Sequence, residues 1–433
     1  MGLGALWNLS FGFFGVQIAY ALQSANSSRI FSTLGVDPHS LSYFWILPPL
    51  LGLLTQPVVG MCSDRTWCRL GRRIPYLYIG ASIAVLVMCL LPNAGSLGLS
   101  LGAAMAFGIL ALMFLDTSIN MAMQPFKMMV GDMVNERQKG LAYSIQSFLC
   151  SSGSVVGFFF PFLLTAVGVS NTASRGVVPD SVIWSFYLGA AILVLCVVYT
   201  TVKVKEWPPR LYAEYNGVSK DTNGRNPGWL TLLRHAPTTF WRVGLVQFFC
   251  WAAFMYMWTY TNGAIAATCW GVDMRDPAAT ATEAYQKASN WVGVLYAVQA
   301  MGSVAWALVL PLFRDRKVGY ALSLVLGGVG FALVPFISNA YVQSVVFLLI
   351  GCAWAAMMAM PFAFVTNALQ GYGYMGTYLG LFNGTICLPQ IVAAMLGGTI
   401  FSVVGSDQAN MMIVAGVSLV MGAMAVTTIK TKG

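Results

Sequence analysis

Residues 71–93 read GRRIPYLYIGASIAVLVMCLLPN, in which two arginines precede twenty residues without a charged side chain. A helix needs about 20 mostly apolar residues to cross the hydrocarbon core of a membrane. The two arginines are expected to stay in water, because a charged side chain is costly at membrane depth. This stretch therefore predicts a membrane-spanning helix.

The same pattern recurs along the chain and predicts twelve spans. They lie at 6–28, 43–62, 74–93, 99–127, 141–166, 182–203, 240–262, 289–312, 318–338, 341–366, 377–400 and 409–428. Of the 433 residues 58% are hydrophobic and only 9% are charged, whereas a soluble chain carries about 25% charged residues. We therefore predict an all-α membrane protein, which excludes an ordinary soluble enzyme.

The lysines and arginines predict the orientation of these spans. On the boundaries above, 18 of the 23 lie on the side of both termini, and four, including Arg29, lie on the other. Cytoplasmic loops carry the excess of basic residues, so both termini are expected in the cytoplasm. The net charge of +9 is then a topology signal, and we expect no nucleic-acid partner.

The longest loop divides the spans into two sets of six. We predict an N-terminal six-helix bundle at 1–203, a cytoplasmic linker at 204–239 and a C-terminal bundle at 240–433. An acid followed by bases recurs after the second span, at Asp64-Arg65, and after the eighth, at Asp315-Arg316. Such an internal repeat is typical of transporters whose substrate site lies between two halves related by a pseudo-twofold axis.

The loop after the second span carries a resemblance to a known family. The sequence Gly60-Met-Cys-Ser-Asp64-Arg65, followed by Gly71-Arg72-Arg73, resembles the signature between helices 2 and 3 of the major facilitator superfamily. The wider sequence resembles the sucrose and maltose:proton branch of the glycoside–pentoside–hexuronide cation symporters. That resemblance rests on Gly15-Val16-Gln17, Ala21-Leu22-Gln23, Leu34-Gly35-Val36, Gln56-Pro57, Pro75-Tyr76, Leu115-Asp116, Asn120, Gln124-Pro125, Asp132, Leu381-Phe382-Asn383 and Pro389-Gln390. It implies a sugar carrier that works by alternating access.

Asp116 is the one acid that lies deep inside a predicted span. A carboxylate there costs about 2.5–3.5 kcal/mol, so its presence indicates a function. Asn120, Gln124 and Lys127 lie within about 80° of it around the helix and form a polar stripe. We predict that Asp116 is the proton carrier and that Lys127 either donates to sugar hydroxyls or pairs with Asp116. The plant sucrose carriers that this branch includes have an arginine at that position, and lysine lacks its planar fork.

A sugar presents hydroxyl rims and apolar C–H faces, so its site should combine amides with aromatic platforms. The predicted substrate-binding residues are Gln23, Asn26, Asn120, Gln124, Lys127, Gln146, Tyr256, Trp258, Tyr296, Gln299, Trp354, Asn383 and Gln390. Asn383 and Gln390 are expected to share one face of the eleventh span. The family pattern favours Gln23 over Gln17 as the residue of the first span that binds substrate.

The same resemblance implies a cytoplasmic gate. It would consist of Asp64, Arg65, Arg72 and Arg73, with the arginines paired to acids such as Asp132 below the fourth span. Asp64 would then cap or bond a neighbouring helix of the second half.

Three functions remain open from the sequence. The first is a proton-coupled importer of a disaccharide or small glucoside, and the second is the same carrier coupled to Na⁺. The third is a transporter-like sugar sensor, which the short tails disfavour. We expect no catalytic constellation, no metal site and no cofactor apart from the coupling proton. His39 and His235 are expected in solvated loops, and the protein is expected to be a monomer among lipids in a bacterial inner membrane.

Overall fold

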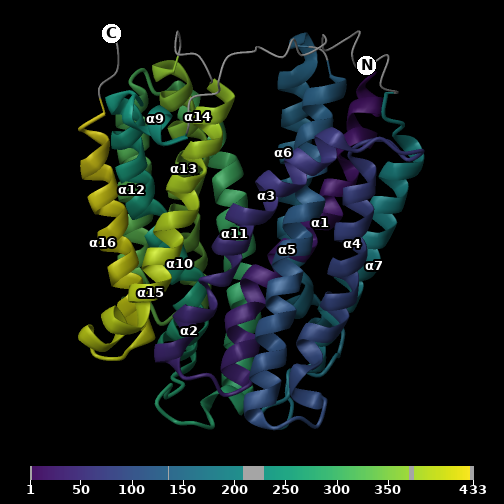
Figure 1. Ribbon diagram of the computed structural model, residues 1–433. Coiled ribbons are helices and arrows are strands. Elements are labelled where there is room, and N and C mark those ends of the chain that lie inside the picture. The colour runs from purple at the N-terminus through teal and green to yellow at the C-terminus, as the bar shows by residue number, and fades with distance from the viewer. Residues whose placement is uncertain (1, 135, 208–228, 370–374, 430–433) are drawn as a thin grey trace. The chain divides into compact units, whose positions relative to one another are not determined.

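The computed structural model describes residues 2–134, 136–207, 229–369 and 375–429, without the side chains of some helical residues, among them Asp64, Arg65 and Lys127. These ranges form α-helices, short 3₁₀ helices and loops, and contain no β-strand (Figure 1). The one β-bridge within them joins Cys68 to Gly71. The expected all-α architecture is therefore confirmed.

The helices follow one another along the chain and are joined mostly by short loops. In chain order they are α1 (Leu3–Thr33), α2 (Pro38–Phe44), α3 (Leu47–Arg65), α4 (Ile74–Leu90), η1 (Leu91–Ser96), α5 (Leu101–Met133), α6 (Glu136–Ala166), α7 (Asp180–Lys203), α9 (Trp229–Arg234), α10 (Thr238–Trp270), η2 (Ala279–Ala281), α11 (Glu283–Val309), η3 (Leu310–Leu312), α12 (Arg316–Leu333), η4 (Val334–Phe336), α13 (Ala340–Ala368), α14 (Met375–Phe382), α15 (Gly384–Val403) and α16 (Gln408–Val426).

Eleven helical segments of the described chain are long and apolar enough to cross a membrane. They coincide with eleven of the twelve predicted spans. The remaining prediction, 43–62, corresponds to α3, which is 19 residues long and is not among the eleven. Its sequence includes Thr55, Gln56, Asp64 and Arg65, which lower its hydropathy.

Short polar side chains begin several spans by accepting hydrogen bonds from otherwise unpaired backbone N–H groups. The Asp315 carboxylate accepts from the backbone N–H of Lys317 at 2.8 Å at the start of α12. The Asp407 carboxylate accepts from the backbone N–H of Ala409 at the start of α16. The acid in the second repeat of the acid-then-base pattern is thus a helix cap.

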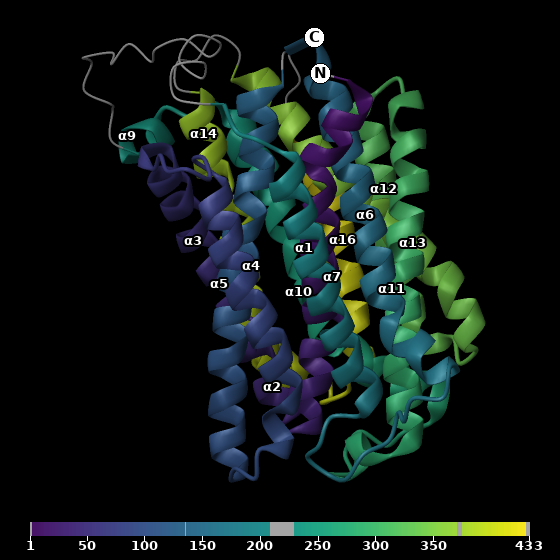
Figure 2. The ribbon, with the colours of Figure 1, turned by 90° about the vertical axis from the view of Figure 1, so that its right-hand side faces the viewer.

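The described chain divides into two compact units. The first comprises Met1–Ile30 with Leu51–Arg225, and the second comprises Phe31–Leu50 with Asn226–Gly433. In the first unit α4 packs beside α5 and α7, and in the second α12 packs beside α13 and α16 (Figures 1 and 2). The predicted bundle boundaries at 203 and 240 remain a prediction.

Residues 31–50 pack within the second unit although they precede it by about 180 residues. Helix α2 lies against α15, where a Cβ on Gly397 would come within 2.7 Å of the Ser42 Cβ. The His39 Nδ1 lies 3.1 Å from the Ser402 hydroxyl, and its ring packs edge-on to Phe401. The expectation of a loop at His39 was therefore wrong, because Asp37 caps a short helix there. The His39 side chain is partly exposed.

Candidate functional site

Asp116 lies in the middle of α5 with only 2% of its surface exposed. Its two carboxylate oxygens accept from different side chains. The Gln23 Nε2 donates to Oδ1 at 3.1 Å, and the Asn120 Nδ2 donates to Oδ2 at 2.9 Å. Asn120 is one helical turn further along α5 and Gln23 is on α1, so the carboxylate joins two helices. No ion pair to Asp116 is present among the described side chains.

The other described polar groups of α1 make no hydrogen bond to Asp116. The Gln23 Oε1 is buried and has no hydrogen-bond partner. The Asn26 Nδ2 donates to the Leu22 carbonyl at 3.0 Å, which is a bond within its own helix. Gln17, which the family pattern disfavours, is 8% exposed and also has an unpartnered Oε1.

The other residues predicted on α5 and α6 are placed as follows. Gln124 is half-buried, and the Lys127 side chain lies outside the described residues. The Gln146 Nε2 of α6 donates to the Phe126 carbonyl of α5 at 3.1 Å. Pro125 lacks the N–H that would bond the Met121 carbonyl of α5. The bond from Gln146 to the Phe126 carbonyl ties α6 to α5 close to this position.

Arg29 is a buried cation, although its position in the sequence predicted an outer loop. Helix α1 continues to Thr33, and Arg29 within it has no exposed surface. Its Nη2 donates to the Asn171 Oδ1 at 3.0 Å, and the same oxygen accepts from the Ser181 hydroxyl at 2.6 Å. The loop assignment was wrong because the predicted span stopped at residue 28, whereas Ile30, Phe31 and Leu34 continue the apolar pattern.

In the second unit, aromatic rings cluster around Trp354 of α13. The rings of Trp251, Phe254 and Trp258, all on α10, lie edge-on to Trp354 with centroids 4.9–5.9 Å away. Trp45 stacks on Trp258 at 6.0 Å with an interplanar angle of 19°. Two predicted substrate residues, Trp258 and Trp354, are therefore in contact. Trp354 is half-buried and the other four residues are buried.

Three further predicted residues of this unit are buried. Tyr256 lies on α10, and the Tyr296 hydroxyl of α11 donates to the Met257 carbonyl at 3.1 Å. Gln299 lies one turn beyond Tyr296 on α11 and is 6% exposed. The Tyr296 hydroxyl thus ties α11 to α10 in this structure.

The eleventh predicted span, 377–400, is interrupted. Helix α14 ends at Phe382 and α15 begins at Gly384, so Asn383 stands at the junction. Asn and Gly are weak helix formers, and Pro389 removes one backbone donor from the first turns of α15. Asn383 and Gln390 are both half-buried, and the Asn383 Nδ2 lies 3.9 Å from the Cys387 sulfur.

The residues before α4 form a network of charges in the first unit. The Asp132 Oδ2 of α5 accepts from the Arg72 Nη2 at 2.6 Å and from the Arg73 Nε at 3.0 Å. Arg73 also donates to the Ser63 hydroxyl of α3, and the Arg72 guanidinium lies over the Trp67 ring. The pairing with Asp132 is the arrangement that the sequence predicts. The side chains of Asp64 and Arg65 lie outside the described residues.

Glu206, which follows α7, is a site residue that the sequence did not reveal. The Glu206 Oε2 accepts from the backbone N–H of Arg72 at 2.9 Å. The Glu206 Oε1 accepts from the backbone N–H groups of Arg73 and Ile74 at 2.7 Å each. A carboxylate is stabilised at a helix N-terminus by these unpaired donors and by the helix dipole. Glu206 thus holds the start of α4. Its signal in the sequence was weak, because its partners are backbone groups.

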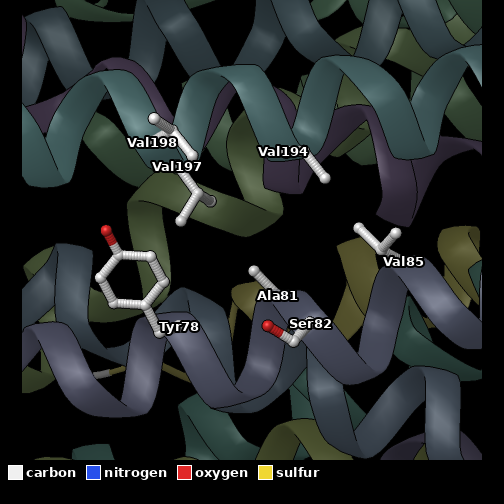
Figure 3. A pocket seen from close by; sticks show the side chains of 7 residues that line it. All are labelled: Tyr78, Ala81, Ser82, Val85, Val194, Val197 and Val198. Atoms are coloured by element: carbon white, nitrogen blue, oxygen red, sulfur yellow. The ribbon is translucent and has the colours of Figure 1, made fainter.

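A groove of about 290 Å³ lies between α4 and α7 in the first unit (Figure 3). Its lining is mainly aliphatic and consists of Tyr78, Ala81, Ser82, Val85, Val194, Val197 and Val198. The Tyr78 hydroxyl is 2.7 Å from the Thr201 hydroxyl, so it is already paired. The lining lacks the amides that a sugar requires. In addition, no group of three or more His, Cys, Asp or Glu among the described residues could hold a metal ion.

Comparison with known proteins supplies the family. Residues 9–394 match the model of the Major Facilitator Superfamily. The chain is 25% identical to "Sucrose transport protein SUT5" of Oryza sativa subsp. indica, over 89% of this chain and 80% of the relative. It is 21% identical to "Sucrose transport protein SUC4" of Arabidopsis thaliana, over 89% and 81%. These relatives are plant proteins and give no support to the bacterial inner membrane expected above.

The solved structures agree on the fold. The nucleoside transporter NupG superposes with a TM-score of 0.71 at 13% identity, covering 99% of this chain and 100% of that one. A bacterial homologue of the human lysosomal transporter Spinster, inward-facing and unoccupied, gives 0.69 at 14% identity, covering 98% and 97%. The family match over residues 9–394 and the shared fold indicate a multi-pass integral membrane protein of a superfamily of transporters, not of enzymes.

Proposed function

Because the chain belongs to the major facilitator superfamily, we propose that it is a proton-coupled symporter importing a disaccharide or small glucoside of the sucrose or maltose type. Asp116 is the proton carrier in this proposal. The observation that carries it is the pair of amide N–H groups that meet the two oxygens of this buried carboxylate. Plant sucrose transport proteins among the relatives support the substrate class.

The hydrogen bonds of Asp116 suggest how proton occupancy acts on the protein. In the charged form both oxygens accept, and they match two N–H donors. A proton on Oδ1 turns that oxygen into a donor and opposes the Gln23 N–H. The Gln23 Oε1 is buried without a partner, so a half-turn of the amide restores a hydrogen bond. Protonation would thus change the contact between α5 and α1.

The same geometry favours H⁺ over Na⁺. A sodium ion needs several oxygen ligands, whereas the two described neighbours of Asp116 present N–H groups to it. A Na⁺ site would require both amides to reverse.

Amides and aromatic rings are the groups expected to contact the sugar. The first unit offers Gln23, Asn120 and Gln146, and the second offers Trp258 and Trp354. Amides both donate and accept, which suits hydroxyl groups. Substrate and proton are released after alternating access, with Arg72, Arg73 and Asp132 forming part of the cytoplasmic gate together with Asp64 and Arg65.

Sugar uptake into proteoliposomes tests the proposal. An imposed proton gradient, inside alkaline, should drive accumulation of radiolabelled sucrose or maltose above equilibrium, while a Na⁺ gradient at equal pH should not. Uptake that ignores the proton gradient removes the symport claim. Asp116→Asn should abolish accumulation yet leave exchange of internal for external sugar. Full accumulation by this variant would remove the proton-carrier role.

A further inference from the structure

Helix α10 carries three buried polar side chains whose hydrogen-bonding atoms have no partner. Both amide atoms of Gln247 are unpartnered, as are both of Asn262 and the Nε1–H of Trp251. The exposed fractions of Gln247, Asn262 and Trp251 are 0%, 3% and 6%. Buried polar groups are normally hydrogen-bonded, and each exception requires an explanation.

The three residues lie on one stripe of α10. At about 100° per residue, Trp251 lies about 40° from Gln247 around the helix, Trp258 about 20° and Asn262 about 60°. Along the axis each tryptophan has an amide one turn away, because Gln247 precedes Trp251 by four residues and Asn262 follows Trp258 by four. The two tryptophans are seven residues apart, or about 10 Å. The order along the helix is therefore amide, tryptophan, tryptophan, amide.

We propose that this stripe is a disaccharide subsite, in which each Trp–amide pair takes one of the two sugar rings. The tryptophan face covers the C–H surface of a ring, and the amide and the Trp251 N–H meet its hydroxyls. Trp354 contacts both tryptophans and is the half-exposed member of the cluster. A sugar would enter from its side when the helices part. This inference rests on the proposed sugar transport, and it adds Gln247, Trp251 and Asn262 to the binding residues.

A sugar fits these groups better than an ion does. The stripe contains no charged residue between Gln247 and Asn262, and the Trp251 N–H can only donate. The amides both donate and accept, which matches hydroxyl groups. Their burial costs free energy in the absence of ligand, and a bound sugar would recover it.

The test compares stability without sugar and affinity for sugar in the purified full-length protein. Gln247→Met and Asn262→Leu remove the unpartnered amides with little change in size, and Trp251→Phe removes the N–H but keeps an aromatic ring. The thermal unfolding midpoint without sugar should stay equal or rise. The ligand-induced shift of that midpoint gives the dissociation constants of sucrose and maltose. For the sugar that binds better, the dissociation constant should rise at least about tenfold.

Gln343→Met is the matched control. Gln343 is equally buried and its Oε1 is also unpartnered, but its Nε2 donates to the Val334 and Ile337 carbonyls at 2.8 and 2.7 Å. This variant should lower the midpoint without sugar. If Gln247→Met and Asn262→Leu behave like the control and bind sugar as the wild type does, the amides are structural and the subsite is wrong. If wild-type protein binds neither sugar, the proposed function fails instead.

Discussion

Replacing Glu206 should loosen the start of α4 by a predictable amount. The Glu206 carboxylate accepts three backbone N–H bonds, and such bonds to a charged acceptor contribute about 1.5–3 kcal/mol each. Because the carboxylate is half-exposed, water replaces part of this in Glu206→Ala, and we take the low end for each amide. A loss of about 1.5 kcal/mol corresponds to about tenfold faster exchange of each amide hydrogen.

Hydrogen exchange of the detergent-solubilised protein, read by mass spectrometry on peptides covering residues 71–78, measures this loss. Glu206→Gln should change the exchange rates of the three amides unequally. The side-chain oxygen can replace Oε1 and keep the Arg73 and Ile74 amides bonded, while the new NH₂ group faces the Arg72 amide. Exchange should therefore accelerate mainly at Arg72.

Lys205→Ala is the control, because Lys205 is the exposed neighbour of Glu206. Its exchange should match the wild type across these peptides. The capping role of Glu206 is refuted if Glu206→Ala exchanges no faster than Lys205→Ala, since the carboxylate would then contribute nothing to the helix start.

Two other substitutions test features of the first unit. Gly71→Ala should accelerate exchange of the same amides with Glu206 intact, because Gly71 has φ +114° and an added Cβ would lie 2.8 Å from the Glu206 Cδ; unchanged exchange would contradict this. Arg29→Met should destabilise the protein by about 1–3 kcal/mol, because it removes a buried charged donor to Asn171. Thermal unfolding measures this, with Arg29→Lys expected to retain part of the stability, and an Arg29→Met midpoint at the wild-type value would show that the bond is dispensable.

The spans and the central acid could be predicted because they depend on local composition. Twenty apolar residues form a helix in a membrane whatever their partners are, and Asp116 stands out against such a background. The position of Asn120 near Asp116 follows from helical periodicity alone. The family pattern favoured Gln23 as a substrate residue, but its bond to Asp116 was not predicted, since helix periodicity does not show which face of α1 meets α5.

Arg29, Glu206 and Trp45 were missed for a different reason. Arg29 stood at the edge of the predicted span, where a hydropathy pattern is least able to place a helix end. Glu206 binds backbone groups more than 130 residues away, and backbone donors leave no mark in the sequence. Trp45 stacks on Trp258 through a tertiary contact between distant segments, which no local pattern indicates.

The placement of residues 31–50 has a consequence for dissecting the chain. A gene cut in the linker at 204–239 would give two polypeptides, and this segment would remain with the first although it packs in the second unit. The second polypeptide alone would leave Gly397, Gly398 and one face of Trp258 uncovered. Co-expressed halves would have to complement each other through this exchanged element, as in a domain swap. First halves that contain residues 36–45 should therefore assemble with second halves, whereas first halves without these residues should not.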